Sequence, residues 1–412
     1  MLFRVLFLGL VLAPLARAGH PVYLVDEAGG AGVDFTSLQV AVAEAEAGST
    51  LLVNTGDYGS IAPAGPLVLH AAPGATVRLA TLTLIGLDDE RGFVVRGASI
   101  EKILVHDCDA PIWFEACTVR DPGVAFAGFT PPGPAVDVYS SPSVVFLRSS
   151  ISQQRASCPG EPCLASLAGG MALWVHESEV YLYDTDVTGG EAAFVPGTRP
   201  QGAHGGAGAT LSDGFLFASG GSLRGGAGSI GAADFGCGVV EAPGPGGHGV
   251  VIWEGGASRF VSDGARLEGG LQGLPFTPAG LACVSPEVQQ ADPILALSGT
   301  VTELDGFPRS FAAESPISGS LELEFTGFAG DAVVLGVGLR QRATFLEPLG
   351  GALLLERPFR AGYVGTVKLD TKQLELPIPG VPAGTRFYAQ ALFVDDAGEM
   401  ALAGGSMVLV VD

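Results

Sequence analysis

The sequence predicts an all-β protein in which a parallel β-helix with an N-terminal capping helix is followed by an antiparallel β-sandwich. Glycine contributes 62 of the 412 residues, yet Val, Leu, Ile and Phe are also frequent. This mixture is typical of many short strands separated by tight turns. The second observation is an internal repeat between residues 103 and 270, and the third is a change of pattern after Cys283.

The first 18 residues have the composition of a secretory signal peptide. Arg4 precedes an apolar run over residues 5–12, and Ala16-Arg17-Ala18 is a small-x-small cleavage site. We therefore expect cleavage before Gly19 and a secreted mature protein. The apolar run is shorter than the roughly 20 residues that a membrane helix needs, and no later stretch reaches that length, so no membrane span is predicted.

Helical periodicity is scarce in this sequence. One stretch shows it, residues 34–59, DFTSLQVAVAEAEAGSTLLVNTGDYG. Its spacing predicts a helix over 36–47, with Thr36 and Gln39 forming a capping box and Gly48 ending it. A solenoid needs its exposed end covered, and this helix is well placed to do so. The predicted apolar face consists of Leu38, Ala41, Val42 and Ala45.

Four segments of the chain align with one another. They begin at Pro132, Gly169, Gly205 and Gly246, 36 to 41 residues apart, and a less regular copy begins at Ile103. Each holds a unit of roughly 20 residues with two or three short apolar runs, followed by an insertion rich in Gly, Pro or Cys. Such units stack at about 4.8 Å, which predicts a parallel β-helix over 19–285. A propeller is the less favoured alternative.

The remaining chain has a different pattern. Residues 286–293 are predicted to be a linker, and residues 294–412 contain longer strands such as SLELEFTGF, RFYAQALFV and SMVLVVD between Gly and Pro turns. This pattern predicts an antiparallel β-sandwich.

Two resemblances support this division. The opening stretch resembles the N-terminal motif of the pectate-lyase-like superfamily, which implies a right-handed parallel β-helix over about 34–275. The tail, GTRFYAQALFVDDAGEMALAGGSMVLVV, resembles a β-sandwich that recurs on exported bacterial proteins. The superfamily includes lyases, hydrolases, esterases, epimerases and adhesins, so the fold does not choose a reaction. The matching positions are Phe35, Leu38, Ala41, Val42, Gly48, Val53, Gly56 and Tyr58.

The cysteines suggest disulfide bonds, since an even number of them occurs in a chain predicted to be exported. We expect three local pairs, although six cysteines allow 15 connectivities. No C-x-x-C motif is present and the histidines are not clustered near the cysteines, so a zinc site is not expected. The predicted pairs are Cys108 with Cys117, Cys158 with Cys163, and Cys237 with Cys283.

The net charge of −22 bears on the possible partners. A surface of this sign repels phosphate backbones, which argues against nucleic-acid binding. It also disfavours polyanionic substrates, whereas neutral glycans and cations are compatible. An early group of charged residues raises the possibility of calcium, but such charges are usually the solvated edge of a strand. That group is Lys102, Asp107, Asp109, Glu115, Arg120 and Asp121.

Polygalacturonases offer the sharpest enzymatic comparison. They use an NTD motif, a paired Asp and a GHG motif on successive coils, and this chain looks similar in the order of Asp184 and Asp186, then Asp213, then His248 within Gly-His-Gly. Their positions within the repeated units differ, so they fall on different faces, whereas a catalytic pair must flank one glycosidic bond within roughly 10 Å. No catalytic residues, and no cofactor, are therefore assigned from the sequence.

Alignment of the units predicts one exposed row of side chains. Two positions of each unit are apolar throughout, as at Val136 and Val138, and so point inward. The alternate positions then point outward. They carry Asp137, Tyr139, Trp174, His176, Ser212 and Trp253.

Aromatic faces beside hydrogen-bonding groups suit sugar rings. The sequence therefore favours a secreted protein for extracellular glycan binding or surface interaction, without catalysis. In the competing interpretation the insertions 155–168, 191–204 and 227–245 fold over the row and bury it. Two further alternatives are a polysaccharide lyase or glycoside hydrolase, and a purely structural coat or matrix protein.

Overall fold

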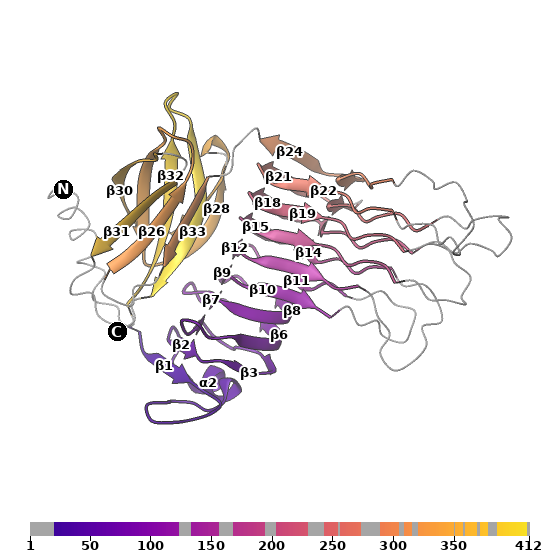
Figure 1. Cartoon of the computed structure of the whole chain (residues 1–412). Helices are drawn as coiled ribbons and strands as arrows, with labels where there is room; N and C mark the ends of the chain where they lie inside the picture. Colours follow the sequence, from indigo (N-terminus) through magenta and orange to yellow (C-terminus); the bar gives the residue numbers. More distant parts are fainter. Residues whose placement is uncertain are drawn as a thin grey trace, which may run out of the picture.

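The computed structural model shows a nearly all-β protein with large parallel sheets and smaller antiparallel sheets (Figure 1). It describes residues 20–122, 133–155, 168–193, 203–229, 243–253, 256–272, 289–304, 309–314, 320–349, 351–356, 359–368, 371–377 and 385–409. The predicted signal peptide lies outside these ranges. Within them, no helix is long and apolar enough to cross a membrane.

The first parallel sheet has ten strands, and they lie next to one another in the order in which they occur along the chain. In Figure 1 they run from the indigo N-terminal end to the orange end of the stack. The strands are β1 (Val22–Val25), β2 (Thr50–Val53), β5 (Val68–Ala71), β7 (Phe93–Arg96), β9 (Ile112–Glu115), β12 (Val144–Leu147), β15 (Glu179–Tyr183), β18 (Phe215–Ser219), β21 (Arg259–Asp263) and β24 (Thr300–Leu304).

The second parallel sheet has fourteen strands and is divided by the insertions. Its long strand β8 (Ala98–His106) pairs with β10 (Thr118–Asp121) near one end and with β11 (Val136–Tyr139) near the other. From β10 onward an insertion separates the two halves. The other strands are β3 (Gly56–Asp57), β4 (Ser60–Ile61), β6 (Val77–Ile85), β13 (Ser150–Gln153), β14 (Leu173–His176), β16 (Asp186–Thr188), β17 (Ala209–Ser212), β19 (Ser222–Arg224), β20 (Val250–Ile252), β22 (Arg266–Glu268) and β23 (Ile294–Ala296).

The interior between the two sheets is filled by the apolar positions that the repeat predicted to point inward. Val136, Val138, Leu173 and Val175 are each 0% exposed. At the N-terminal end, helix α2 (Leu38–Glu44) buries Leu38, Ala41 and Val42 against this core. The helix cap differs from the prediction, because Ser37, not Thr36, accepts the hydrogen bond from Val40 N.

The corners between the sheets share one backbone conformation. Residues in the left-handed region follow strand after strand: Asp107, Ser140, Glu177 and Asp213 on one side, and Ala116, Arg148 and Asp184 on the other. In six of these seven corners the next residue is Ser, Thr or Cys, and its side chain links neighbouring turns. Ser141 Oγ donates to Tyr139 O and accepts from Cys108 N, and Ser141 N donates in turn to Ser178 Oγ.

The predicted bond between Cys108 and Cys117 is wrong, since both residues are buried thiols. They occupy the corner positions that Ser or Thr fills in later turns, and their Sγ atoms donate to His106 O and Glu115 O. The extended strand β9 separates the two corners, whereas a disulfide requires Cα atoms within about 7 Å. The other four cysteines, Cys158, Cys163, Cys237 and Cys283, lie outside the described residues.

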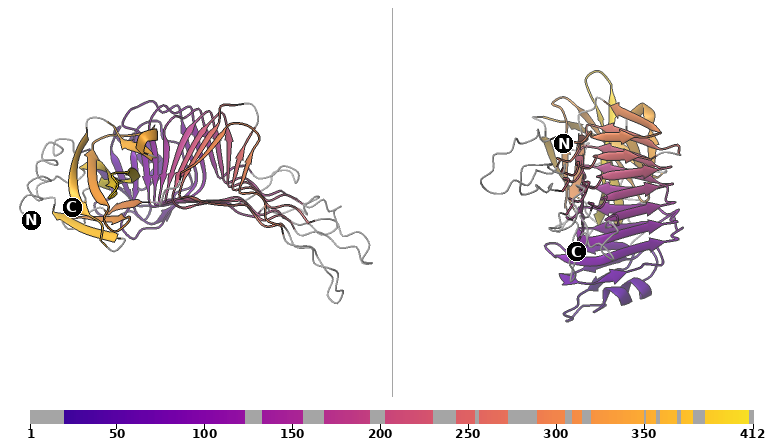
Figure 2. Two further views of the ribbon diagram at one scale, coloured as in Figure 1. Left: turned by 90° about the horizontal axis from the view of Figure 1, so that it is seen from above. Right: turned by 90° about the vertical axis from the view of Figure 1, so that its right-hand side faces the viewer.

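Glycines form a continuous column where the insertions leave and rejoin the second sheet. Gly206 N donates to Gly190 O, and Gly226 N donates to Gly206 O, both at 2.8 Å. Segments that lead from the sheet into an insertion alternate in this column with segments that lead back from one. Figure 2 shows these segments running side by side away from the stacked strands. A Cβ on Gly206 would lie 2.0 Å from Gly170 O, so no side chain fits there. The column consists of Gly170, Gly190, Gly206, Gly226, Gly247, Gly270 and Ala291.

The antiparallel sheets begin later than the sequence predicted. β23 pairs in parallel with β20, and β24 pairs in parallel with β21, so residues 294–304 extend the first region of the chain. The three antiparallel sheets are formed by β25 (Ser310–Glu314), β26 (Ser320–Thr326) and β31 (Thr371–Pro377); by β27 (Ala332–Gly338), β30 (Phe359–Thr366), β32 (Arg386–Val394) and β33 (Met400–Leu409); and by β28 (Gln341–Leu346) and β29 (Gly351–Leu355). A short 3₁₀ helix, η2, spans Glu347–Leu349.

The outer face of the ten-stranded sheet is buried against the antiparallel region. Trp113 packs edge-on against Tyr388 at 5.2 Å between ring centroids, and both are 0–1% exposed. The strands of this sheet are therefore buried on both faces, which explains uninterrupted apolar runs such as VVFL in β12. The outer cluster includes Val94, Trp113, Val145, Leu147, Tyr181, Tyr183, Phe217, Val261, Ala352, Leu354, Tyr388 and Met407.

A buried ionic network crosses the same junction. The carboxylate of Glu115, 0% exposed, accepts from Ser406 Oγ at 2.7 Å and from Met407 N at 3.0 Å. Arg96 at the end of β7 and Arg148 in the corner after β12 approach it from the two neighbouring turns. The same two guanidiniums donate to backbone carbonyls of the antiparallel region, namely Phe311, Ala313 and Met407.

Candidate functional site

The strand register brings the predicted outer residues together. Asp137 is opposite Trp174, and Tyr139 is opposite His176, in the pairing of β11 with β14. His176 is opposite Ser212 on β17, and Trp253 N donates to Leu211 O at 3.0 Å one strand further on. These residues therefore lie along one face of the second sheet.

The rings in this row contact one another. The Tyr139 and His176 rings are stacked, with 5.0 Å between centroids and 13° between planes. Trp174 lies 6.1 Å from the His176 ring in a tilted arrangement. We call this set of side chains the outer row. It consists of His106, Asp137, Tyr139, Trp174, His176, Ser212 and Trp253.

His106 is a member of the outer row that the sequence analysis missed. It is opposite Tyr139 in the register of β8 with β11, and the two rings meet edge-on at 5.9 Å. Its Nε2 lies 3.3 Å from Asp137 Oδ2. The signal was present, because ILVHD from Ile103 aligns with VDVYS from Val136, but the long strand β8 made that copy irregular.

The row is accessible at several points. Tyr139 is 38% exposed and Trp253 is 53% exposed, while His106, Asp137, Trp174 and His176 are partly buried. The insertions that were predicted as a possible cover fall mostly outside the described residues. Among the described residues, Nδ1 of His176 has no hydrogen-bond partner.

The residues considered for catalysis occupy separate places. Asp184 and Asp213 are left-handed corner residues after β15 and β17. His248 lies beside the glycine column, with Nδ1 2.8 Å from Asp292 O. The arrangement therefore does not bring these three side chains to one point.

The early acidic residues are also dispersed. Glu115 is buried in the junction network, Asp107 is a corner residue, and Asp121 accepts from Gln153 Nε2 at 2.9 Å. Across the described parts of the chain, no group of three or more His, Cys, Asp or Glu side chains is close enough to hold a metal ion.

Comparison with known proteins adds no further assignment. No protein-family model matches this chain, and no curated protein matches it. The outer row is therefore interpreted from its own geometry and chemistry.

Proposed function

We propose that this is a secreted protein that binds an extracellular glycan along the outer row. The observation that carries the proposal is the run of aromatic and polar side chains at one register position of neighbouring strands, with Tyr139 and Trp253 exposed. Neighbouring strands are about 4.8 Å apart. A linear glycan lying across them would meet one side chain of the row at each strand.

The chemistry of the row suits sugars. Aromatic faces pack on the apolar C–H faces of sugar rings, and the imidazoles, Ser212 and Asp137 offer hydrogen bonds to hydroxyl groups. A neutral glycan also avoids the repulsion that a polyanion would experience from a protein of net charge −22.

The fold proposed for this function is a right-handed parallel β-helix of the pectate-lyase-like type, followed by an antiparallel β-sandwich. Support comes from the chain-ordered parallel strands, the helix α2 at one end and the three antiparallel sheets. Secretion is supported by the signal-peptide pattern of residues 1–18.

The test compares glycan binding by the native protein and a Tyr139→Ala/Trp253→Ala double variant. On a glycan array followed by calorimetry with the best ligand, we expect affinity to fall at least tenfold, because each ring contributes roughly 0.5–1.5 kcal/mol beyond its burial. Tyr363→Ala is the matched control, since Tyr363 is 59% exposed on β30, away from the row. Equal losses in both variants, or no glycan bound by the native protein, would contradict the proposal.

A further inference from the structure

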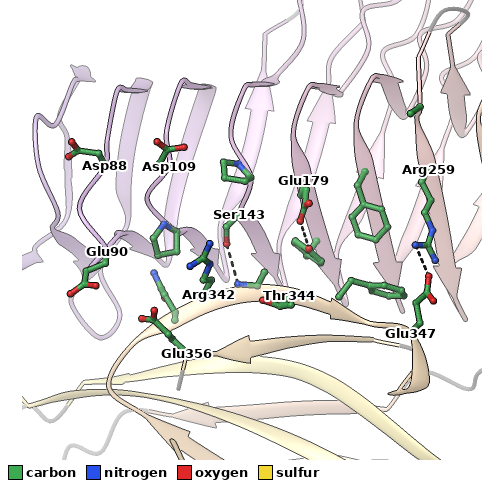
Figure 3. A pocket seen from close by; sticks show the side chains of 18 residues that line it. Asp88, Glu90, Asp109, Ser143, Glu179, Arg259, Arg342, Thr344, Glu347 and Glu356 are labelled. Carbon is green, nitrogen blue, oxygen red and sulfur yellow. Dashed lines mark hydrogen bonds and ion pairs between the residues drawn. The ribbon is translucent and has the colours of Figure 1, made fainter. Parts of the chain in front are cut away.

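A cleft of about 830 Å³ lies between the ten-stranded sheet and strand β28. Figure 3 shows Asp88, Asp109, Glu179 and Arg259 along one side, facing Arg342, Thr344 and Glu347 on the other. The first four residues belong to different turns of the stack. The cleft therefore follows the stacking direction and is separate from the outer row.

The lining is predominantly acidic. Six carboxylates and two guanidiniums line it, and Glu90 is paired with Arg340 at 2.6 Å. No ion pair is formed by Asp88, Asp109 or Glu179 among the described residues, and all three are exposed. The charged lining residues are Asp88, Glu90, Asp109, Glu179, Glu347, Glu356, Arg259 and Arg342.

The protein itself shows how a cation is held in this cleft. The Arg259 guanidinium lies over the rings of Phe215 and Phe345, at 5.7 and 5.3 Å from their centroids. Its Nη1 pairs with Glu347 Oε1 at 3.0 Å. Residues from both sides of the cleft thus combine aromatic faces with a carboxylate, which is the combination that binds guanidinium and ammonium groups.

A buried amide on the cleft wall lacks a partner. Gln341 lines the cleft and is 1% exposed, yet neither its Oε1 nor its Nε2 is hydrogen-bonded within the described structure. A buried polar group without a partner costs free energy. A carboxamide offers one acceptor and one donor group, which is the complement of a peptide bond.

We propose that the cleft binds an extended peptide segment rich in arginine or lysine. The lining spans six neighbouring strands, from β7 to β21, which corresponds to about 24 Å at 4.8 Å per step. An extended peptide of about seven residues covers that length. Its basic side chains would meet Asp88, Asp109 and Glu179 on three turns of the stack, and the Gln341 amide would bind its backbone.

The carboxylates are spread along the cleft. An extended peptide with several basic side chains presents its positive charges in a similar row. Glu179 is held in place by a hydrogen bond from Tyr181 Oη at 2.7 Å, so one carboxylate is already oriented. Among the unpaired acids, Asp88 and Asp109 lie in the turns before the adjacent strands β7 and β9.

The test measures fluorescence anisotropy of fluorescein-labelled hexa-arginine with the full chain. We expect salt-sensitive binding that weakens at least tenfold in Asp109→Asn/Glu179→Gln, because both substitutions retain shape and remove charge. Ala257→Lys adds a cation at the exposed rim and should also weaken binding. Circular dichroism would verify that each variant is folded.

The matched control is Glu101→Gln/Glu303→Gln, which removes the same number of charges from exposed positions outside the cleft. Unchanged affinity in this control supports the proposal. An equal loss would show general attraction to a protein of net charge −22 and overturn it. Spermine competing as well as hexa-arginine would also overturn it, because the site would then recognise free polyamines instead of a peptide.

Discussion

At the scale of single residues, the corners of the parallel stack place aspartates of the same backbone conformation in different surroundings. Seven non-glycine residues adopt the left-handed conformation in the described chain. Three of them are Asp, which adopts this conformation more readily than most residues. Asp184 differs from the exposed corner residues Asp107 and Asp213 because it is partly buried. Burial raises its pKa to about 6, although the Arg148 guanidinium acts in the opposite direction.

This shift predicts a pH-dependent effect of Asp184→Asn. A folded pKa above the ordinary value of 3.8 means that the contribution of Asp184 to stability is complete below pH 3.8 and is lost as the pH rises through about 6. We expect the variant to be more stable than the native protein by about 1–3 kcal/mol at pH 7.5. Near pH 4 the difference should be small.

Urea unfolding at both pH values provides the measurement. Asp213→Asn is the control for the corner backbone, because Asp213 adopts the same left-handed conformation after β17. A gain for Asp184→Asn of equal size at pH 4 and pH 7.5 would disprove the role of charge.

At the scale of structural elements, the glycine column explains why glycine recurs at the starts of the repeated units. The N–H and C=O groups of glycines in departing and returning segments bond to one another, and a side chain would separate the segments. The sequence analysis used these glycines only to mark where the repeated units begin and where the insertions follow. Their close backbone approach depends on strands from neighbouring turns, which no single unit contains.

The column predicts a large effect of Gly206→Ala. The new Cβ would lie 2.0 Å from Gly170 O, so the backbone must shift. We expect a loss of about 1–3 kcal/mol in the free energy of unfolding, as for other overpacked sites. Gly65→Ala is the control, since no atom lies within 4 Å of its added Cβ. Thermal unfolding of both variants is the measurement, and equal melting temperatures would contradict the prediction.

At the scale of the whole molecule, the junction joins two regions that are distant in sequence. Glu115 and Ser406 are 291 positions apart, yet their side chains are hydrogen-bonded. Burial opposes ionisation of Glu115, but Arg96, Arg148 and the donors from Met407 and Ser406 outweigh it and lower its pKa below 4.5. The stability that its charge contributes is therefore present above pH 4.5 and is lost as the pH falls through the lower, folded value.

Glu115→Gln should consequently loosen the junction. Removing one partner of a buried pair leaves charges uncompensated and costs roughly 3–5 kcal/mol. We expect that loss at pH 7 and a smaller difference from the native protein well below pH 4.5. Denaturant unfolding followed by tryptophan fluorescence is suitable, because Trp113 is buried in the same interface. Exposed Glu101→Gln should unfold like the native protein, and an equal loss there would exclude the proposed cause.

The sequence by itself determined the nearly all-β character, the repeating parallel strands, the N-terminal helix and, apart from His106, the positions of the outer row. Each of these depends on short-range periodicity, which alternation and glycine spacing record directly. Only the tertiary structure decided that Cys108 and Cys117 are corner thiols, that β23 and β24 continue the parallel sheets, and that Glu115 and the acidic cleft lie against the antiparallel region. Those outcomes depend on contacts between different turns of the chain, from 33 positions apart for Cys108 and Ser141 to 291 for Glu115 and Ser406, and a local pattern carries no record of such contacts.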